Sequence, residues 1–302
     1  MAKKRLTRHR PKRAKRRRRS ASILNRRYST LICILLTALI IFITQQPPDL
    51  GPIDGEIRVH FIDVGQGDSI LVQSTDHAVL IDAGPPAAGQ SLVVYLESLG
   101  IRHLDYVIAT HPHSDHIGGM PGVLDRFLVG ELWMPDVAHD TATFERFLDA
   151  IERNHLEIIT VQAGDVLSAG PIRMIAVSPN RSGYSNLNDY SIVLHMQYGH
   201  TSFLFTGDAE VLSENEMVAA GWDLQADILN VGHHGSRTST TDSFLYAVDP
   251  HIAVISLAAD NQFNHPHPEV LDRLARRGIE VLRTDELGTI VMSTDGEYIY
   301  LY

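Results

Sequence analysis

The chain has 302 residues, of which 44% are apolar and 22 are glycine, and this composition excludes an intrinsically disordered protein. It carries 26 lysines and arginines against 36 aspartates and glutamates, but 14 of the basic residues lie between Lys3 and Arg27, where there is no acid. The remaining 12 basic and 36 acidic residues give the rest of the chain a formal charge of −24, which weighs against a surface built to bind nucleic acid.

The first predicted element is a membrane anchor over residues 28–46. Its centre is the uncharged run 31–44, which follows Arg26 and Arg27 after three polar residues. These 14 residues span only roughly 21 Å as a helix, so the polar residues beside them are needed to approach a hydrocarbon core of ~30 Å. An uncleaved anchor is favoured over a cleaved signal peptide, because no small-residue cleavage site follows. The positive-inside rule then places residues 1–27 in the cytoplasm as a basic tail and the rest of the chain outside the cytoplasmic membrane. Contact of this tail with anionic lipid or nucleic acid is an alternative to a pure orientation signal.

A linker over residues 47–55 is predicted to lead into one domain over residues 56–302. The single cysteine, Cys33, lies in the anchor, so this domain has no disulfide and no thiolate ligand. Alternating apolar residues predict strands near 57–61, 70–72, 77–82, 104–110, 156–161, 172–178, 191–197, 202–206, 227–231 and 252–256, and helices at 90–99, 144–154, 213–220 and 268–277. Residues 198–200 predict a hairpin turn. This alternation indicates a mixed α and β domain.

The most informative stretch holds four potential metal ligands, His111, His113, Asp115 and His116, between a predicted buried strand and a Gly-Gly pair. A strand that ends there delivers imidazoles and a carboxylate onto a tight loop, and zinc and similar cations accept both donor types. A polar loop that is merely rich in histidine is the alternative, and the clustering disfavours it. The sequence therefore predicts a hydrolytic metal centre.

The H-x-H-x-D-H pattern resembles the metallo-β-lactamase-fold hydrolases, and further motifs make the chain similar to the extracytoplasmic hydrolase domain of the ComEC-type competence proteins. These motifs are FIDVGQGDS at 61–69, LIDAG at 80–84, FTGD at 205–208, VGHHGS at 231–236 and NHPHPE at 264–269. The resemblance covers about residues 56–295. It implies an α/β (α+β) fold, a four-layered αββα sandwich with the active site along one edge.

The resemblance also implies two divalent ions, zinc or manganese. His111 and His113 are expected to hold one ion, Asp115 and His116 the second, and Asp208 is expected to bridge them. His234 is the expected further ligand by similarity to choline-phosphate esterases.

A histidine that is usual in the superfamily near residues 186–191 is missing. His195, within a predicted strand, and His200, in the hairpin turn, are the only candidates nearby. The first ion is therefore expected to have fewer protein ligands, as in the ComEC-type branch.

Asp115 and His267 are the expected catalytic residues. His267 and His265 share a face if the chain is extended, so one of them is expected to reach the substrate or a metal as a proton donor, and the other to cap the following helix.

Five further residues are expected near the ligands or the substrate. Asp63 and Asp82 are expected to orient histidines through their free ring nitrogens, with loop capping as the alternative. On an extended chain His233 would point away from His234, and is therefore expected to lie behind the ligands or to contact phosphate. Ser236 and Arg237 are expected to bind phosphate, with a helix cap and a surface charge as the alternatives.

Three functions follow as hypotheses. The first is a membrane-anchored phosphodiesterase or nuclease that acts on an anionic phosphodiester, with DNA among the candidates. The second is a hydrolase of another anionic ester, such as a choline-phosphate or cell-wall phosphodiester, and the acidic domain favours it. The third and weakest is a non-catalytic envelope protein. Apart from the membrane and this substrate, the sequence indicates no protein partner, and one membrane segment disfavours transport by this chain alone.

Overall fold

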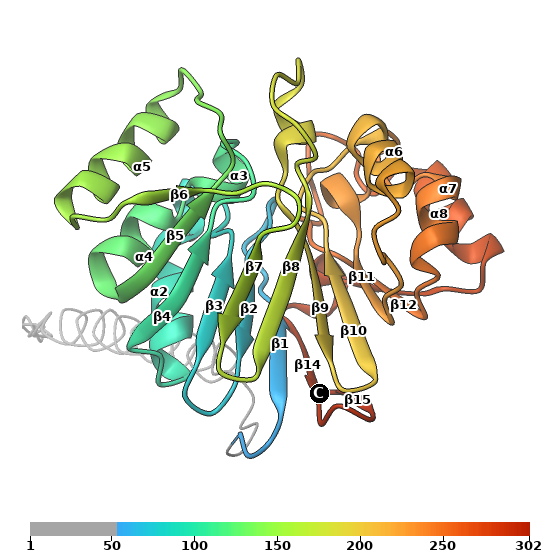
Figure 1. Ribbon diagram of the computed structural model, residues 1–302, viewed down its shortest axis with the longest axis horizontal. Helices are drawn as coiled ribbons and strands as arrows, with labels where there is room; N and C mark the ends of the chain where they lie inside the picture. The colour runs from blue at the N-terminus through green and yellow to red at the C-terminus, as the bar shows by residue number, and fades with distance from the viewer. Residues whose placement is uncertain (1–52) are drawn as a thin grey trace, which may run out of the picture. The chain divides into compact units, whose positions relative to one another are not determined.

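Two β-sheets lie face to face in residues 53–302, the part of the chain that the computed structural model describes (Figure 1). The predicted basic tail, the anchor and most of the linker lie outside the described residues. Within residues 53–302 no helix is both long enough and apolar enough to cross a membrane.

The first sheet has eight strands in the order β15-β14-β1-β2-β3-β4-β5-β6. Their bounds are β1 Ile57–Phe61, β2 Ile70–Gln73, β3 Ala78–Ile81, β4 His103–Ile108, β5 Leu128–Met134, β6 Ile158–Thr160, β14 Ile290–Thr294 and β15 Ile299–Leu301. The strands β3 to β6 run parallel, and β1 pairs antiparallel with β2 and β14.

The second sheet has seven strands in the order β13-β12-β11-β10-β9-β8-β7. Their bounds are β7 Val166–Ala169, β8 Ile172–Ser178, β9 Val193–Tyr198, β10 Thr201–Phe205, β11 Ile228–Asn230, β12 Ile252–Ile255 and β13 Glu280–Arg283. The strands β10 to β13 run parallel, and β9 and β10 form the predicted antiparallel hairpin, which turns through Gly199 at φ 60°.

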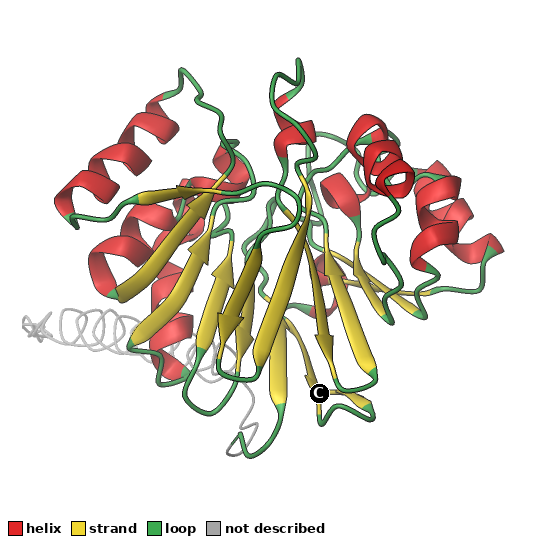
Figure 2. Cartoon of the chain, viewed as in Figure 1, coloured by secondary structure: helices red, strands yellow, loops and turns green. Residues whose placement is uncertain are grey.

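Helices cover the outer face of each sheet, as Figure 2 shows. The first sheet carries α2 (Gly89–Ser98), α4 (Met120–Arg126) and α5 (Ala142–Arg153), and the second carries α6 (Val211–Ala220), α7 (Asp242–Val248) and α8 (Pro268–Arg276). The remaining short helices are η1 Pro86–Ala88, α3 Ser114–Ile117, η2 Leu187–Tyr190, η3 Gly232–Gly235 and α9 Thr284–Leu287. The layers therefore follow the order helix, sheet, sheet, helix.

Side-chain alternation along β1 explains how one strand serves two cores. Ile57, Val59 and Phe61 point into the apolar core between the sheets. The intervening Arg58 and His60 point to the other face, because successive strand residues face opposite sides. His60 there accepts or donates a 2.8 Å hydrogen bond with the hydroxyl of Tyr95 on α2.

Burial of His60 makes the fold sensitive to acid. The side chain is 0% exposed, and its Nε2 has no hydrogen-bond partner in the described part of the chain. Burial, with a smaller effect of the Arg58 charge, lowers the pKa of His60 to about 3. The folded chain therefore keeps this imidazole neutral at pH values where the unfolded chain, with a pKa near ~6.5, takes up a proton.

Because the pKa of His60 differs between the folded and unfolded chain, we expect the free energy of unfolding to fall by about 2 kcal/mol when the pH is lowered from 7.5 to 5. The sign follows from the lowered folded-state pKa: the stability is present above pH ~6.5 and is lost as the pH falls toward the folded-state value. Replacing His60 with leucine and Tyr95 with phenylalanine together should remove this loss in denaturant titrations at the two pH values. The control is His251→Leu, whose side chain is 82% exposed, and which should leave the pH dependence unchanged. A double variant as acid-sensitive as the wild type would contradict the assignment.

Two glycines allow the loops at one edge of the sheets to meet. A Cβ at Gly118 would lie 2.3 Å from Cδ of Pro86, and one at Gly119 would lie 2.2 Å from the carbonyl oxygen of Ala83. Only glycine tolerates such approaches. The Gly-Gly pair therefore lets the loop that follows β4 pack directly against the loop that follows β3.

Candidate metal centre

The predicted ligand loop begins where β4 ends. After Ile108 the chain passes through His111 and His113 into α3, which contains Asp115 and His116. The carboxyl ends of the parallel strands β3, β4, β10 and β11 meet at the same edge, which is where open α/β sheets place their sites.

Asp208, in the loop after β10, is the centre of the cluster, because its two oxygens face different groups of side chains. We call the first the His111 group: the Nε2 of His111 lies 3.6 Å from Oδ2 of Asp208 and 2.9 Å from Nδ1 of His113. Ligand atoms of these three residues all lie within 4.8 Å of one another.

The second, the His116 group, faces the other oxygen. Oδ1 of Asp208 lies 3.2 Å from Nε2 of His116 and 3.5 Å from Nε2 of His234. Asp115 joins this group through its Oδ2, 3.5 Å from the same nitrogen of His234. Burial opposes the ionisation of Asp208, but the surrounding histidines outweigh it and hold the pKa of this carboxyl well below its usual value.

Hydrogen bonds behind the ligands fix which ring nitrogen faces the centre. Asp82 accepts from the amide and the hydroxyl of Thr110, at 2.9 and 2.7 Å, and from Nδ1 of His116 at 2.7 Å. His234 donates through Nδ1 to the carbonyl oxygen of Ser256 at 2.9 Å. Because the outer nitrogens are held in this way, the Nε2 atoms of His116 and His234 face Asp208.

The structure overturns the premise of an extended chain at the His-His pair. His233 and His234 lie in η3 with φ values of 50° and 53°, so their side chains do not alternate. Both Nε2 atoms approach Asp208, and that of His233 lies 3.7 Å from Oδ2, the oxygen that also faces the His111 group. Glu210 accepts from Nδ1 of His233 at 3.1 Å and from the side-chain amide of Asn188 at 2.9 Å.

Ser191 lies in the segment where the superfamily usually has a further histidine ligand. Its hydroxyl accepts from the amide of Asp208 at 3.1 Å and lies 3.4 Å from Nδ1 of His111. The segment therefore supports the ligands through hydrogen bonds instead of supplying one.

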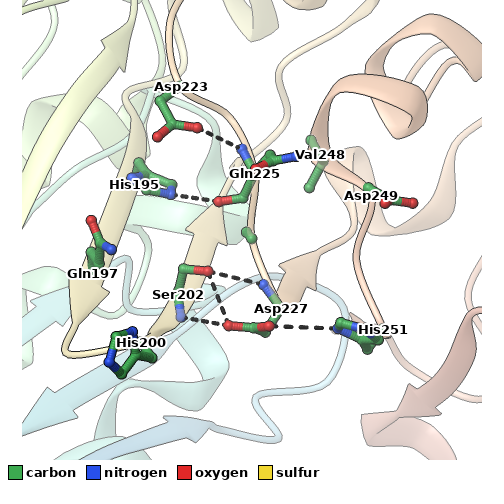
Figure 3. A pocket seen from close by; sticks show the side chains of 11 residues that line it. His195, Gln197, His200, Ser202, Asp223, Gln225, Asp227, Val248, Asp249 and His251 are labelled. Atoms are coloured by element: carbon green, nitrogen blue, oxygen red, sulfur yellow. Dashed lines mark hydrogen bonds and ion pairs between the residues drawn. The ribbon is translucent and has the colours of Figure 1, made fainter. Parts of the chain in front are cut away.

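His195 and His200 line a separate cavity of about 330 Å³ at the hairpin end of β9 and β10, whereas Asp208 follows the other end of β10 (Figure 3). Its polar groups are paired with one another: His195 contacts the carbonyl oxygen of Gln225 at 2.8 Å, and Asp227 accepts from the amide of Ser202 at 2.8 Å. No buried side-chain atom of the lining residues lacks a partner within the described chain. These two histidines are therefore not ligands of the candidate centre.

The rings of His265 and His267 lie 4.8 Å apart, but the two residues have different further neighbours. The His265 ring lies 5.5 Å from that of His233, and burial together with the neighbouring histidines lowers the pKa of His265 to about 4. His267 stands at the N-cap position of α8 without a side-chain cap, and its Nδ1 accepts from the amide of Arg237 at 3.1 Å. Its Nε2 lies 3.3 Å from the guanidinium of the same arginine. His265 thus adjoins the centre, and His267 pairs with Arg237 at the exposed rim.

Asp63, Asp82 and Ser236 have different roles in the structure. Asp63 accepts from the amide of Gly65 at 3.1 Å and so caps its own loop, in contrast to Asp82, which holds His116. Ser236 follows η3, and its hydroxyl contacts that of Thr238 at 3.0 Å.

Asp68 is a residue of this site that sequence reasoning missed. Its ligand atoms lie within 4.8 Å of those of Asp208 and His234, and also within 4.8 Å of those of Asp82 and His116. Burial raises the pKa of its carboxyl. The sequence could have indicated Asp68, because it lies near the end of the FIDVGQGDS motif, which joins β1 to β2 at the same edge of the sheet.

Whether these residues fit a metal ion can be judged from the buried nitrogen and oxygen atoms that lack a hydrogen bond. Five atoms are buried and have no hydrogen-bond partner among the described residues: Nε2 of His116, Nε2 of His234, Oδ1 of Asp208 and both carboxylate oxygens of Asp68. Buried polar atoms rarely remain unpaired, because desolvation without a partner costs free energy. Nitrogen and oxygen donors that converge in this way suit a divalent cation, so the residues fit a metal centre.

A sequence profile of the Metallo-beta-lactamase superfamily matches residues 62–259. The chain is 35% identical over 256 residues to ComE operon protein 3 of Bacillus subtilis, an alignment that covers 79% of this chain and 33% of that protein. It is 31% identical to competence protein ComA of Neisseria gonorrhoeae, over 80% of this chain and 33% of that protein. The chain thus spans about a third of the length of these curated relatives.

Solved structures share the fold at low identity. The metallo-beta-lactamase fold protein YhfI of Bacillus subtilis aligns with a TM-score of 0.50 and 17% identity, over 82% of this chain and 100% of that chain. CmlA, a diiron beta-hydroxylase from Streptomyces venezuelae, aligns with a TM-score of 0.52 and 14% identity, over 77% of this chain and 53% of that chain. Because proteins with different chemistry share this fold, the reaction has to be argued from the site.

Proposed function

The chain belongs to the metallo-beta-lactamase superfamily, and from this premise we propose that it is a metal-dependent phosphodiesterase that cleaves DNA outside the cytoplasmic membrane. The observation that carries the proposal is the position of Asp208, whose two oxygens face two separate groups of ligand atoms. Such an arrangement suits two divalent ions that share one carboxylate, with zinc or manganese as the candidates.

Two bound divalent ions would lower the pKa of a water molecule and offset the negative charge of a phosphodiester. The chain's own part is to orient the ligands: Asp82 and the Ser256 carbonyl oxygen hold the rings of His116 and His234. Glu210 orients the His233 ring, so that its Nε2 faces the space beside Asp208, where a phosphate oxygen would lie. Preorganised side chains of this kind reduce the reorganisation that the reaction requires.

The relative named competence protein ComA, which aligns over 80% of this chain, supports DNA as the substrate. The charge of −24 beyond residue 27 supports a second candidate, the hydrolysis of a smaller anionic ester such as a choline-phosphate or cell-wall phosphodiester. The two candidates use the same centre and differ in what the acidic surface admits.

For the location, we propose that residues 28–46 anchor the chain with residues 1–27 in the cytoplasm and the hydrolase domain outside. The charge asymmetry supports this orientation. Protease added to intact cells or wall-stripped protoplasts should digest the domain while a cytoplasmic control stays intact. Equal protection of the two proteins would overturn the orientation.

An activity screen tests the proposed substrate. The full chain in detergent, stripped of metal and reloaded with manganese or zinc, should cleave single- or double-stranded DNA at low salt. Its affinity for DNA should fall only gently with salt, with a slope that corresponds to about one to three phosphate contacts, because the acidic domain offers few cations. If the metal-loaded chain leaves DNA intact but hydrolyses a nucleotide diester, a phosphocholine ester or a lactone, the second candidate replaces the first.

A further inference from the structure

Asp68 is the one carboxylate of the candidate centre that is buried with both oxygens unpaired. The side chain is 2% exposed, and neither oxygen has a hydrogen-bond partner within the described residues. By contrast, both oxygens of Asp82 accept hydrogen bonds from Thr110 or His116. An isolated buried carboxylate is among the most costly groups to desolvate, so this one requires a positive partner or a proton.

Backbone contacts hold Asp68 in this position. A Cβ at the preceding Gly67, whose φ is 143°, would lie 2.2 Å from the carbonyl oxygen of Asp115, so the two loops touch directly. The carbonyl oxygen of Asp68 accepts from the amide of Gly84 at 2.8 Å, and the hydroxyl of Ser69 donates to the carbonyl oxygen of Asp82 at 3.1 Å. The loop backbone is therefore tied on both sides to the loops that carry the ligands.

The unpaired oxygens face other unpaired donor atoms. Ligand atoms of Asp68, Asp208 and His234 lie within 4.8 Å of one another, and those of Asp68, Asp82 and His116 form a second such set. Nε2 of His116, Nε2 of His234 and Oδ1 of Asp208 are themselves buried and make no hydrogen bond within residues 53–302. One cation between Asp68, Asp208 and His234 would meet donor atoms that all lie within 4.8 Å of one another.

We propose that Asp68 is a further carboxylate ligand of the metal ion held by the His116 group, an inference that rests on the proposed metal centre. The His116 group then offers three carboxylates, from Asp68, Asp115 and Asp208, beside the two imidazoles of His116 and His234. The His111 group offers two imidazoles and the shared carboxylate.

This difference in donors gives the two groups different metal preferences. Carboxylate oxygens suit harder ions such as manganese, which accept more ligands, whereas zinc is satisfied by fewer donors that include nitrogen. Asp68 therefore favours manganese at the His116 group.

The test is the replacement of Asp68 with asparagine in the full chain. After the metal is removed, manganese alone is titrated, and the bound ions are counted by metal analysis and by electron paramagnetic resonance. The wild type should bind two ions. The variant should keep the ion of the His111 group and bind the second at least about tenfold more weakly, with a smaller loss for zinc than for manganese.

Thermal unfolding gives a second readout that separates a ligand from a structural residue. Without metal, the variant should unfold at a higher temperature than the wild type, because it lacks an uncompensated buried carboxylate. With manganese, it should gain less stability than the wild type, because the second ion binds more weakly. Asp68→Ser should behave in the same way, so that poor folding of one variant does not decide the result.

The matched control is Asp63→Asn, which removes an exposed carboxylate from the same loop and should change neither readout. The inference is overturned if Asp68→Asn binds two manganese ions as tightly as the wild type, or if it loses stability equally with and without metal. A wild-type chain that binds neither manganese nor zinc would instead overturn the proposed metal centre itself.

Discussion

Replacing Asp208 with alanine is expected to remove both metal ions and to lower hydrolysis by about a thousandfold or more. Oδ1 of this residue faces the His116 group and Oδ2 faces the His111 group, so the substitution deprives both groups of a ligand. Ligand number sets metal affinity, so the metal content should fall together with the activity. The measurement is metal content after dialysis, beside the hydrolysis of whichever substrate the wild type cleaves.

Asp105→Ala is the control for a lost carboxylate. Asp105 accepts from the amide of Ala78 at 2.9 Å and contacts His77 at 3.0 Å, at the end of β4 that lies away from the ligand loop. This variant should lose stability but keep both ions. Unchanged metal occupancy in Asp208→Ala would mean that another group joins the two positions.

Replacing His113 with alanine is expected to lower hydrolysis by a comparable factor while leaving the His116 group occupied. His113 belongs to the His111 group only, and it is half-buried, so its loss removes one metal position with little disturbance of the core. One ion per chain should remain in metal analysis, and the rate should fall by about a thousandfold because water activation needs both positions.

His139→Ala is the matched control for this variant. The His139 ring lies 5.8 Å from that of His113, but His139 does not belong to any of the ligand groups in the described chain. It should therefore keep two ions and most of the activity. Loss of both ions in His113→Ala, or full activity with one ion, would contradict the division into two groups.

Much of the framework could be predicted because its signals are local. The helices expected at 90–99, 144–154, 213–220 and 268–277 correspond to α2, α5, α6 and α8 within about two residues, since a buried stripe at helical spacing is visible in any short window. Elements without such a pattern were not predicted. The strand β7 alternates in burial over only four residues, and the helix α7 has only seven residues, so both are too short for periodicity to identify them.

The sequence by itself determined the ligand loop, because His111, His113, Asp115 and His116 lie within six residues and need only a strand end to bring them together. It also indicated Asp208 through its motif.

Only the tertiary structure decided the rest of the centre. The left-handed backbone at His233 and His234 turns both rings toward Asp208, and periodicity cannot predict a backbone in this region. Asp68 reaches the site from a loop 40 residues or more before the ligand loop, and its burial depends on contacts with the backbone of that loop. Local patterns show which residue types can bind a metal, but long-range packing decides which of them lose water and face one another.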